Sequence, residues 1–316
     1  MEQYAYFLHF ISIGLVVALT SIGVGIGAGF TGQATVRNLY RQPGAATDLY
    51  KASFISLALV ETSGIFSIVM AFILLFNKEV PNFFGSIGTL GIAFGLGIAG
   101  FVTGIYSSLP AQAAFKAIAR QPFFAPRIIN LMVIAQSLIQ TPVIFGLIVS
   151  LLISASISSA QMLAEGTQLL AAGLCIGLGS IGPTIGLGRF TYEACYTAGI
   201  NRSAYGKIVP FTLISGAIIE TPLIFTLIVA LLVTQTTFEN SFVEIVIPFM
   251  AALCMGLGAL GAGLASSRTA TAACIGIGKD PHATSLISKA SLVAQALIDA
   301  IAIYALLIAL LMIFLR

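Results

Sequence analysis

Charged side chains are scarce in this sequence. Only 8% of its 316 residues are Asp, Glu, Lys or Arg, whereas 58% are hydrophobic, and the mean hydropathy is +1.05. A soluble domain carries about 25% charged residues, so the composition predicts a protein that crosses a membrane several times. The net charge of +3 is too small to indicate a nucleic-acid partner.

Residue patterns typical of catalysis or metal binding are also missing. The sequence has two histidines, and its four cysteines form no Cys-x-x-Cys pair. We find no nucleophile–base pair and no phosphate-binding loop. We therefore expect no metal, no cofactor and no enzymatic activity from the chain on its own.

Eight apolar stretches are long enough to cross a membrane. A spanning helix needs about 20 apolar residues, and the candidates cover residues 5–40, 45–76, 84–119, 124–153, 163–198, 203–234, 241–277 and 282–315. They form four pairs, each with a short polar turn between its two helices. The predicted fold is an all-α membrane protein of four tandem helical hairpins, at residues 1–79, 80–158, 159–238 and 239–316.

One polar residue lies near the middle of the second helix of each pair. These residues are Glu61, Gln140, Glu220 and Asp299, at intervals of 79, 80 and 79 residues. A carboxyl at membrane depth costs about 3 kcal/mol or more, so it is a candidate functional group. The fixed spacing indicates one repeated unit, and three carboxyls at one position predict a device that carries a small cation.

The first helix of each pair is rich in small residues. Glycines recur in the first hairpin at Gly23, Gly25, Gly27 and Gly29, and in the fourth at Gly256, Gly258, Gly261 and Gly263. Small faces let membrane helices approach closely. We therefore expect these helices to pack side by side, and several chains to close into a ring.

Basic residues collect in the turns within the pairs, and acidic residues in the links between them. The turns contain Arg37, Arg41, Arg120, Arg127, Arg202 and Lys279, and the links contain Glu79, Glu165, Glu239 and Glu244. By the positive-inside rule, the turns within the hairpins should face the cytoplasm.

The first two hairpins resemble the c subunit of F-type ATP synthases. The resemblance is carried by the glycines of residues 23–29, by the turns Arg41-Gln42-Pro43 and Arg120-Gln121-Pro122, and by the segment around Glu61. Members of that family are helical hairpins with a glycine-rich first helix and one carboxylate on the second. Four fused hairpins are similar to the duplicated proteolipids of V-type ATPases.

In the second half of the chain, the resemblance is less uniform. The turn of the third hairpin, Ile200-Asn201-Arg202, departs from the family pattern, and this hairpin matches by position. The fourth hairpin resembles the family's carboxylate site at Asp299 and Tyr304.

The resemblance implies a rotor ring in a rotary ATP synthase or ATPase. Copies of the chain would form the ring in contact with membrane lipids, beside a stator a subunit with an essential arginine, and couple ion flow to ATP synthesis or hydrolysis. The ion would be carried by Glu61, Glu220 and Asp299. Gln140 would be a non-carrying equivalent, because an amide cannot load and release a proton.

The resemblance also implies a location and a docking face. The ring would lie in a bacterial inner membrane, with its cytoplasmic turns against central-stalk subunits. The residues expected to make this contact are Arg41, Gln42, Arg120 and Gln121, whose alternative role is that of ordinary turn residues.

We expect the carried ion to be a proton, with sodium as the alternative. Sodium needs several fixed oxygen ligands beside the carboxylate, and its carriers in this family have a glutamine on the first helix where this chain has Ala28, Ser107, Leu187 and Ser266. The hydroxyls expected to support the sites are those of Thr62, Thr221 and Tyr304.

Two other functions are compatible with parts of the sequence. A secondary transporter or channel can also have parallel repeats and intramembrane carboxyls, but four equal two-helix units lack the broken helices that alternating access uses. A purely structural proteolipid would not need three carboxyls at one position of the repeat.

Overall fold

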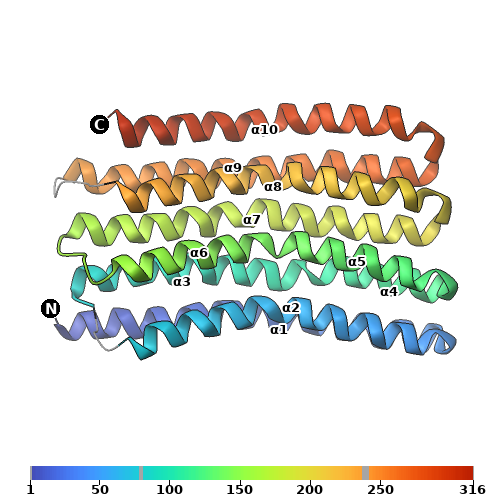
Figure 1. Ribbon diagram of the computed structural model, residues 1–316, viewed down its shortest axis with the longest axis horizontal. Helices are drawn as coiled ribbons and strands as arrows, with labels where there is room; N and C mark the ends of the chain where they lie inside the picture. The colour runs from blue at the N-terminus through green and yellow to red at the C-terminus, as the bar shows by residue number, and fades with distance from the viewer. Residues whose placement is uncertain (1, 78–80, 237–241, 316) are drawn as a thin grey trace.

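The four predicted hairpins stack one on the next along the chain. The computed structural model describes residues 2–77, 81–236 and 242–315 (Figure 1). All regular elements of this part of the chain are helices, and eight stretches are long and apolar enough to cross a membrane. The prediction of an all-α protein of eight spanning helices in tandem hairpins is confirmed.

Within the described residues, the eight spans contain ten α-helices, because two spans are interrupted. In chain order, the helices are α1 (Glu2–Arg41), α2 (Ala46–Phe76), α3 (Phe83–Tyr106), α4 (Ser108–Arg120), α5 (Ala125–Ile139), α6 (Thr141–Ser156), α7 (Leu163–Ile200), α8 (Tyr205–Gln235), α9 (Phe242–Lys279) and α10 (Thr284–Phe314). A short 3₁₀ segment joins the two helices of each hairpin, at Pro43–Ala45, Pro122–Phe124, Arg202–Ala204 and Pro281–Ala283.

Both interruptions lie in the second hairpin and next to a proline. Between α3 and α4 the helix breaks at Ser107, and between α5 and α6 it breaks at Gln140. Pro110 and Pro142 follow these points, and a proline cannot donate the hydrogen bond of the preceding helical turn. In contrast, α8 continues through Pro222 as one helix.

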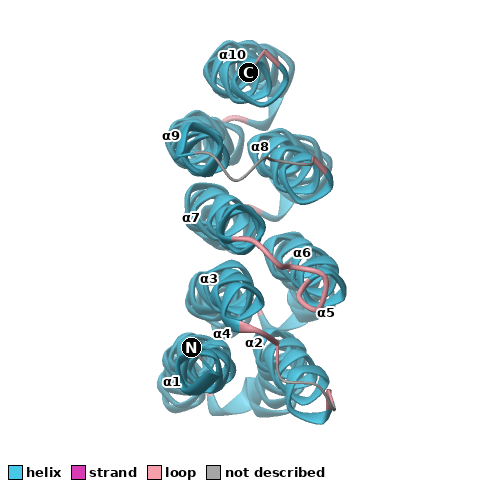
Figure 2. Ribbon diagram, turned by 90° about the vertical axis from the view of Figure 1, so that its left-hand side faces the viewer, coloured by secondary structure: helices cyan, strands magenta, loops and turns pink. Residues whose placement is uncertain are grey.

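The helices form two rows when viewed end-on (Figure 2). One row, which we call the first row, contains α1, α3 with α4, α7 and α9, and neighbouring members pack directly against each other. The second row contains α2, α5 with α6, and α8. The last helix, α10, packs on both α9 and α8 at the end of the stack.

Each hairpin repeats the preceding one with a constant offset. We call two positions equivalent when they occupy the same place in the repeat, which advances by 79 residues from the first hairpin to the second, 80 to the third and 79 to the fourth. By this definition Glu61, Gln140, Glu220 and Asp299 are equivalent. Contacts between neighbouring hairpins can be compared in the same way.

Glycines set the spacing of the first row. A Cβ atom on Gly173 of α7 would overlap the backbone of Gly91 on α3, and one on Gly27 of α1 would overlap the backbone at Gly104. Backbones can approach this closely only where side chains are absent. Packing between the first helices therefore depends on glycine at particular positions.

We expect Gly173→Ala to destabilise the fold. The added methyl group must push α7 away from α3, and overpacking of this kind costs about 1–3 kcal/mol. The matched control is Gly64→Ala in α2, where a Cβ would lie 3.8 Å from Val24 Cγ2. Denaturation in detergent, followed by far-ultraviolet circular dichroism, measures both variants; equal stability of the two would contradict the proposed role of Gly173.

Candidate functional site

The four polar centres lie in the second helices, at equivalent positions, but they differ in burial. Glu61 of α2 is exposed, and Glu220 of α8 is half-buried. Gln140, between α5 and α6, is only 5% exposed, and Asp299 of α10 is 7% exposed. The carboxyl of the first hairpin is therefore the most accessible one in a single chain.

Gln140 binds the helix of the preceding hairpin with both ends of its amide. Its Nε2 donates to the Leu59 carbonyl at 2.7 Å, and its Oε1 accepts from the Ser63 hydroxyl at 3.2 Å. Leu59 and Ser63 flank Glu61 on α2. The amide therefore ties the second hairpin to the first at the depth of the carboxyls.

Two further glutamines cross between hairpins one helical turn closer to the tight turns. Gln136 donates to the Ser56 hydroxyl at 2.9 Å and to the Ser107 carbonyl at 2.9 Å. Gln295 donates to the Ser215 hydroxyl at 3.2 Å. Both glutamine–serine pairs are 80 residues apart, and each joins a hairpin to the one before it. These residues were not expected from the sequence, although their spacing, close to the repeat length, was a usable signal.

Glu220 also faces the preceding hairpin. The side chain of Thr141, at the start of α6, lies beside the Glu220 carboxyl. Glu220 Oε1 and Asp299 Oδ1 are buried without a hydrogen-bond partner. Each of these two carboxyls thus has an oxygen that is sheltered from solvent and available to a bound cation.

The hydroxyls expected to support the sites have other roles in this structure. Those of Thr62 and Thr221 donate to carbonyls of their own helices, Ala58 at 3.0 Å and Ala217 at 3.2 Å. Tyr304 is 65% exposed. Thr141, which was not selected from the sequence because its own hairpin has no carboxyl, approaches Glu220 instead.

Two prolines leave backbone carbonyls without their usual donors beside the sites. Pro142 and Pro222 have no N–H, so the carbonyls of Leu138 and Ile218, four residues earlier, lose a helical hydrogen bond. Both are equivalent to Leu59, whose carbonyl accepts the amide of the second hairpin.

The turn residues are placed at one end of the stack and are partly engaged with one another. Arg41 and Arg120 are exposed, and Gln42 is half-buried. Arg120 donates to the Tyr196 hydroxyl at 3.1 Å, and Gln121 donates to the Gly199 carbonyl at 2.9 Å. The second turn is thereby fixed to the third, while the arginine side chains keep exposed surface.

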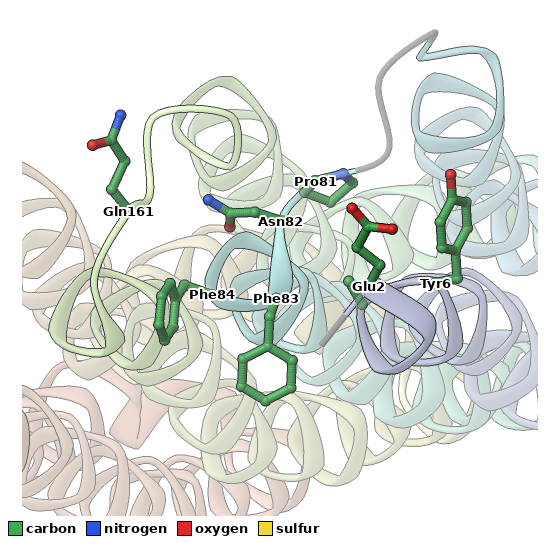
Figure 3. A pocket seen from close by; sticks show the side chains of 8 residues that line it. Glu2, Tyr6, Pro81, Asn82, Phe83, Phe84 and Gln161 are labelled. Carbon is green, nitrogen blue, oxygen red and sulfur yellow. The ribbon is translucent and has the colours of Figure 1, made fainter.

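A pocket with a volume of about 590 Å³ lies away from the carboxyls. It is formed between the first turns of α1 and α3, and its lining includes Glu2, Tyr6, Pro81, Asn82 and Phe83 (Figure 3). Asn82 caps α3 and donates to the Ala160 carbonyl, so the polar group here has a structural role. Among the described residues, no cluster of His, Cys, Asp or Glu could hold a metal ion.

Three segments of the chain match the sequence model of the family of ATP synthase C subunits. They cover residues 11–74, 90–153 and 249–312, more than half of the chain. These segments fall in the first, second and fourth hairpins and include Glu61, Gln140 and Asp299. The third hairpin lies between the matches, and its place in the repeat relates it to the others.

Individual relatives agree with this match. The K subunit of the A-type ATP synthase of Methanocaldococcus jannaschii is 26% identical over 71% of this chain and 94% of its own length. The ATP synthase c subunit of Dehalococcoides mccartyi is 40% identical over 22% of this chain, and that of Chloroflexus aurantiacus is 36% identical over the same share. The chain, which is built from four fused hairpins, therefore belongs to the family of ATP synthase C subunits and is a rotor-ring component of a rotary ATPase.

Proposed function

We propose that the chain carries protons on Glu61, Glu220 and Asp299 as the ring turns. The main support is that three carboxyls occupy one position of the repeat, on the second helices of their hairpins, and that two of them have a buried, unpartnered oxygen. A carboxyl surrounded by apolar side chains and lipid is held in its neutral form, because desolvation disfavours the charge. A proton is then carried around the ring without an unpaired charge entering the membrane.

Release of the proton requires that the environment of the carboxyl change at one point of the ring's rotation. A stator a subunit with an essential arginine would supply it, because a nearby positive charge favours the ionised carboxylate. The proton leaves at that point, and the carboxyl is loaded again before it returns to lipid. Alternation between the two environments couples ion flow to rotation, and hence to ATP synthesis or hydrolysis elsewhere in the assembly.

The tight turns would face the cytoplasm and contact the central stalk. Their excess of arginine and lysine supports this orientation, as would be expected in a bacterial inner membrane. Arg41 and Arg120, both exposed, are the stronger candidates for the stalk contact. Gln42 and Gln121 would act mainly by holding the turns in shape, as Gln121 does through Gly199.

A proton is favoured over sodium as the carried ion. The Thr62 and Thr221 hydroxyls are used within their own helices, and the exposed Tyr304 does not enclose Asp299. The three hydroxyls expected as ligands are therefore not arranged around the carboxylates, whereas sodium needs several fixed oxygen ligands. A proton needs only the carboxyl and one acceptor for its O–H group.

Labelling of membranes with a hydrophobic carbodiimide tests the assignment. The reagent attacks protonated carboxyls in apolar sites, so we expect adducts at Glu61, Glu220 and Asp299 by peptide mass spectrometry, with and without sodium. Protection by sodium would replace the proton with sodium as the carried ion. If none of the three carboxyls is labelled, the proposed carrier role is wrong.

Gln140→Glu should raise the number of ions carried by each ring. The chain then has four carboxyls instead of three, so the ion-to-ATP ratio should increase by about one third, because ring size is unchanged. Ion uptake and ATP turnover in vesicles that contain the whole complex measure this ratio. Gln140→Leu is the control, since it removes the amide without adding a carrier, and an unchanged ratio in Gln140→Glu would contradict the proposal.

A further inference from the structure

We infer that Gln295 is a further residue of the ion site in the fourth hairpin, where its side-chain oxygen accepts the hydrogen bond of protonated Asp299. Because this acceptor matters only to a carboxyl that carries a proton, the role of Gln295 rests on the proposed carrier function. It also sets Asp299 apart from Glu61 and Glu220, which have no side-chain acceptor at the same place on their helices.

Two buried acceptor oxygens lie on one face of α10. Gln295 is fully buried and Asp299 is 7% exposed, and residues four apart in a helix are neighbours on its surface. Within the described part of the chain, Gln295 Oε1 and Asp299 Oδ1 both lack a hydrogen-bond partner. Helical side chains lean toward the N-terminus of their helix, so the carboxyl leans toward the turn that carries the amide. Both oxygens can only accept, and a proton on Asp299 satisfies both.

The orientation of the Gln295 amide follows from the equivalent Gln136. Gln295 Nε2 binds the Ser215 hydroxyl, but a hydroxyl can donate as well as accept. Gln136 makes the same contact with the equivalent Ser56, and its Nε2 also donates to the Ser107 carbonyl at 2.9 Å. A carbonyl only accepts, so the nitrogen of Gln136 is turned to this side and its oxygen is left unpartnered. The amide of Gln295 therefore has its oxygen free in the same way.

The length of the carboxyl side chain favours an acceptor on the same helix. Gln140 reaches across to the Leu59 carbonyl of the preceding hairpin at 2.7 Å, and a glutamate has the same reach as a glutamine. Asp299 is one methylene shorter, so its carboxyl stays nearer its own helix. A partner one turn back on α10 suits this shorter side chain.

The short carboxyl and the amide occur together in the sequence. In chain order, the residues four positions before the three carriers are Leu57, Gly216 and Gln295. Leucine and glycine have no acceptor side chain. An acceptor at this position is therefore found beside the aspartate and beside neither glutamate.

Two other contacts compete with this role and must be separated from it. Gln295 joins α10 to the preceding hairpin through Ser215, as Gln136 joins α5 to Ser56. On α9, Ser266 Oγ is another buried oxygen without a partner. A test must therefore distinguish an acceptor for the proton from a junction between hairpins and from an acceptor on α9.

Carbodiimide labelling of assembled rings, at a fixed alkaline pH at which labelling is incomplete, tests the role of Gln295. A hydrogen bond that only the protonated carboxyl can donate favours this form, and the reagent reacts with it. Gln295→Leu should therefore slow labelling of Asp299 about threefold or more, with Glu61 and Glu220 labelled as before. Gln295→Met keeps the length of the side chain and should give the same result, also where Gln295→Leu prevents assembly.

Three control variants separate the competing roles. Ser215→Ala removes the junction and keeps Gln295 Oε1, Ser266→Ala removes the oxygen on α9, and Gln136→Leu makes the same change in a hairpin without a carrier. All three should leave labelling of Asp299 unchanged. If Ser215→Ala slows it as much as Gln295→Leu does, Gln295 acts by joining the hairpins and the inferred role is wrong. Slowing by Ser266→Ala alone would place the acceptor on α9.

A longer carboxyl should remove the need for the amide. In the background Asp299→Glu, the side chain has the reach that Gln140 shows toward the preceding hairpin. Labelling at position 299 should then be insensitive to Gln295→Leu. Equal slowing in both backgrounds would contradict the pairing of a short carboxyl with this amide.

The outcomes also separate the role of Gln295 from the carrier function. If Asp299 is labelled but Gln295→Leu and Gln295→Met do not slow the reaction, the role of Gln295 is wrong while the carrier function stands. Faster labelling in these variants would mean that the amide nitrogen faces the carboxylate, which also overturns the inferred role. If the unsubstituted ring is labelled at none of the three carboxyls, the carrier function fails, and the role of Gln295 fails with it.

Discussion

A polar side chain inside a membrane must find its partner in protein, and three glutamines of this chain find theirs on the neighbouring hairpin. Gln140 illustrates the constraint, because its amide is satisfied by a carbonyl and a hydroxyl of α2 rather than by its own helix. Gln136 and Gln295 follow the same rule one turn away. Since the partners of Gln140 come from the hairpin before it, this polar centre cannot be understood from its own hairpin alone.

Close packing of the first row makes these contacts possible. Glycines such as Gly173 bring the backbones of adjacent helices together, which fixes the height and rotation of each hairpin against the next. The packing of the first row also sets the positions of the second helices, so that Glu220 lies beside Thr141 at the depth of the carboxyls. A shift between helices of the first row would therefore break hydrogen bonds between helices of the second row.

The repeat length made the hairpins and the row of polar centres predictable from sequence, because a fixed offset and a 20-residue apolar run are both visible in a single chain. The partners of the carboxyls were not predictable in the same way. Thr62 and Thr221 adjoin carboxylates in the sequence, which predicts that they support the sites. A threonine in a helix, however, readily donates to a carbonyl one turn back, and both do. Thr141 adjoins the amide of Gln140 in the sequence, and only the packing of α6 against α8 shows that it lies beside the Glu220 carboxyl.

The amide of Gln140, at the position where the other hairpins have a carboxyl, has a structural consequence. A protonated carboxyl has one donor, whereas the amide has two donors and an acceptor, so Gln140 can bind Leu59 and Ser63 together. These two hydrogen bonds hold α5 and α6 against α2 at the break between α5 and α6, where Pro142 has removed a backbone hydrogen bond. The amide of Gln140 thus anchors a junction at which the second helix is interrupted, through two hydrogen bonds where a protonated carboxyl could donate only one.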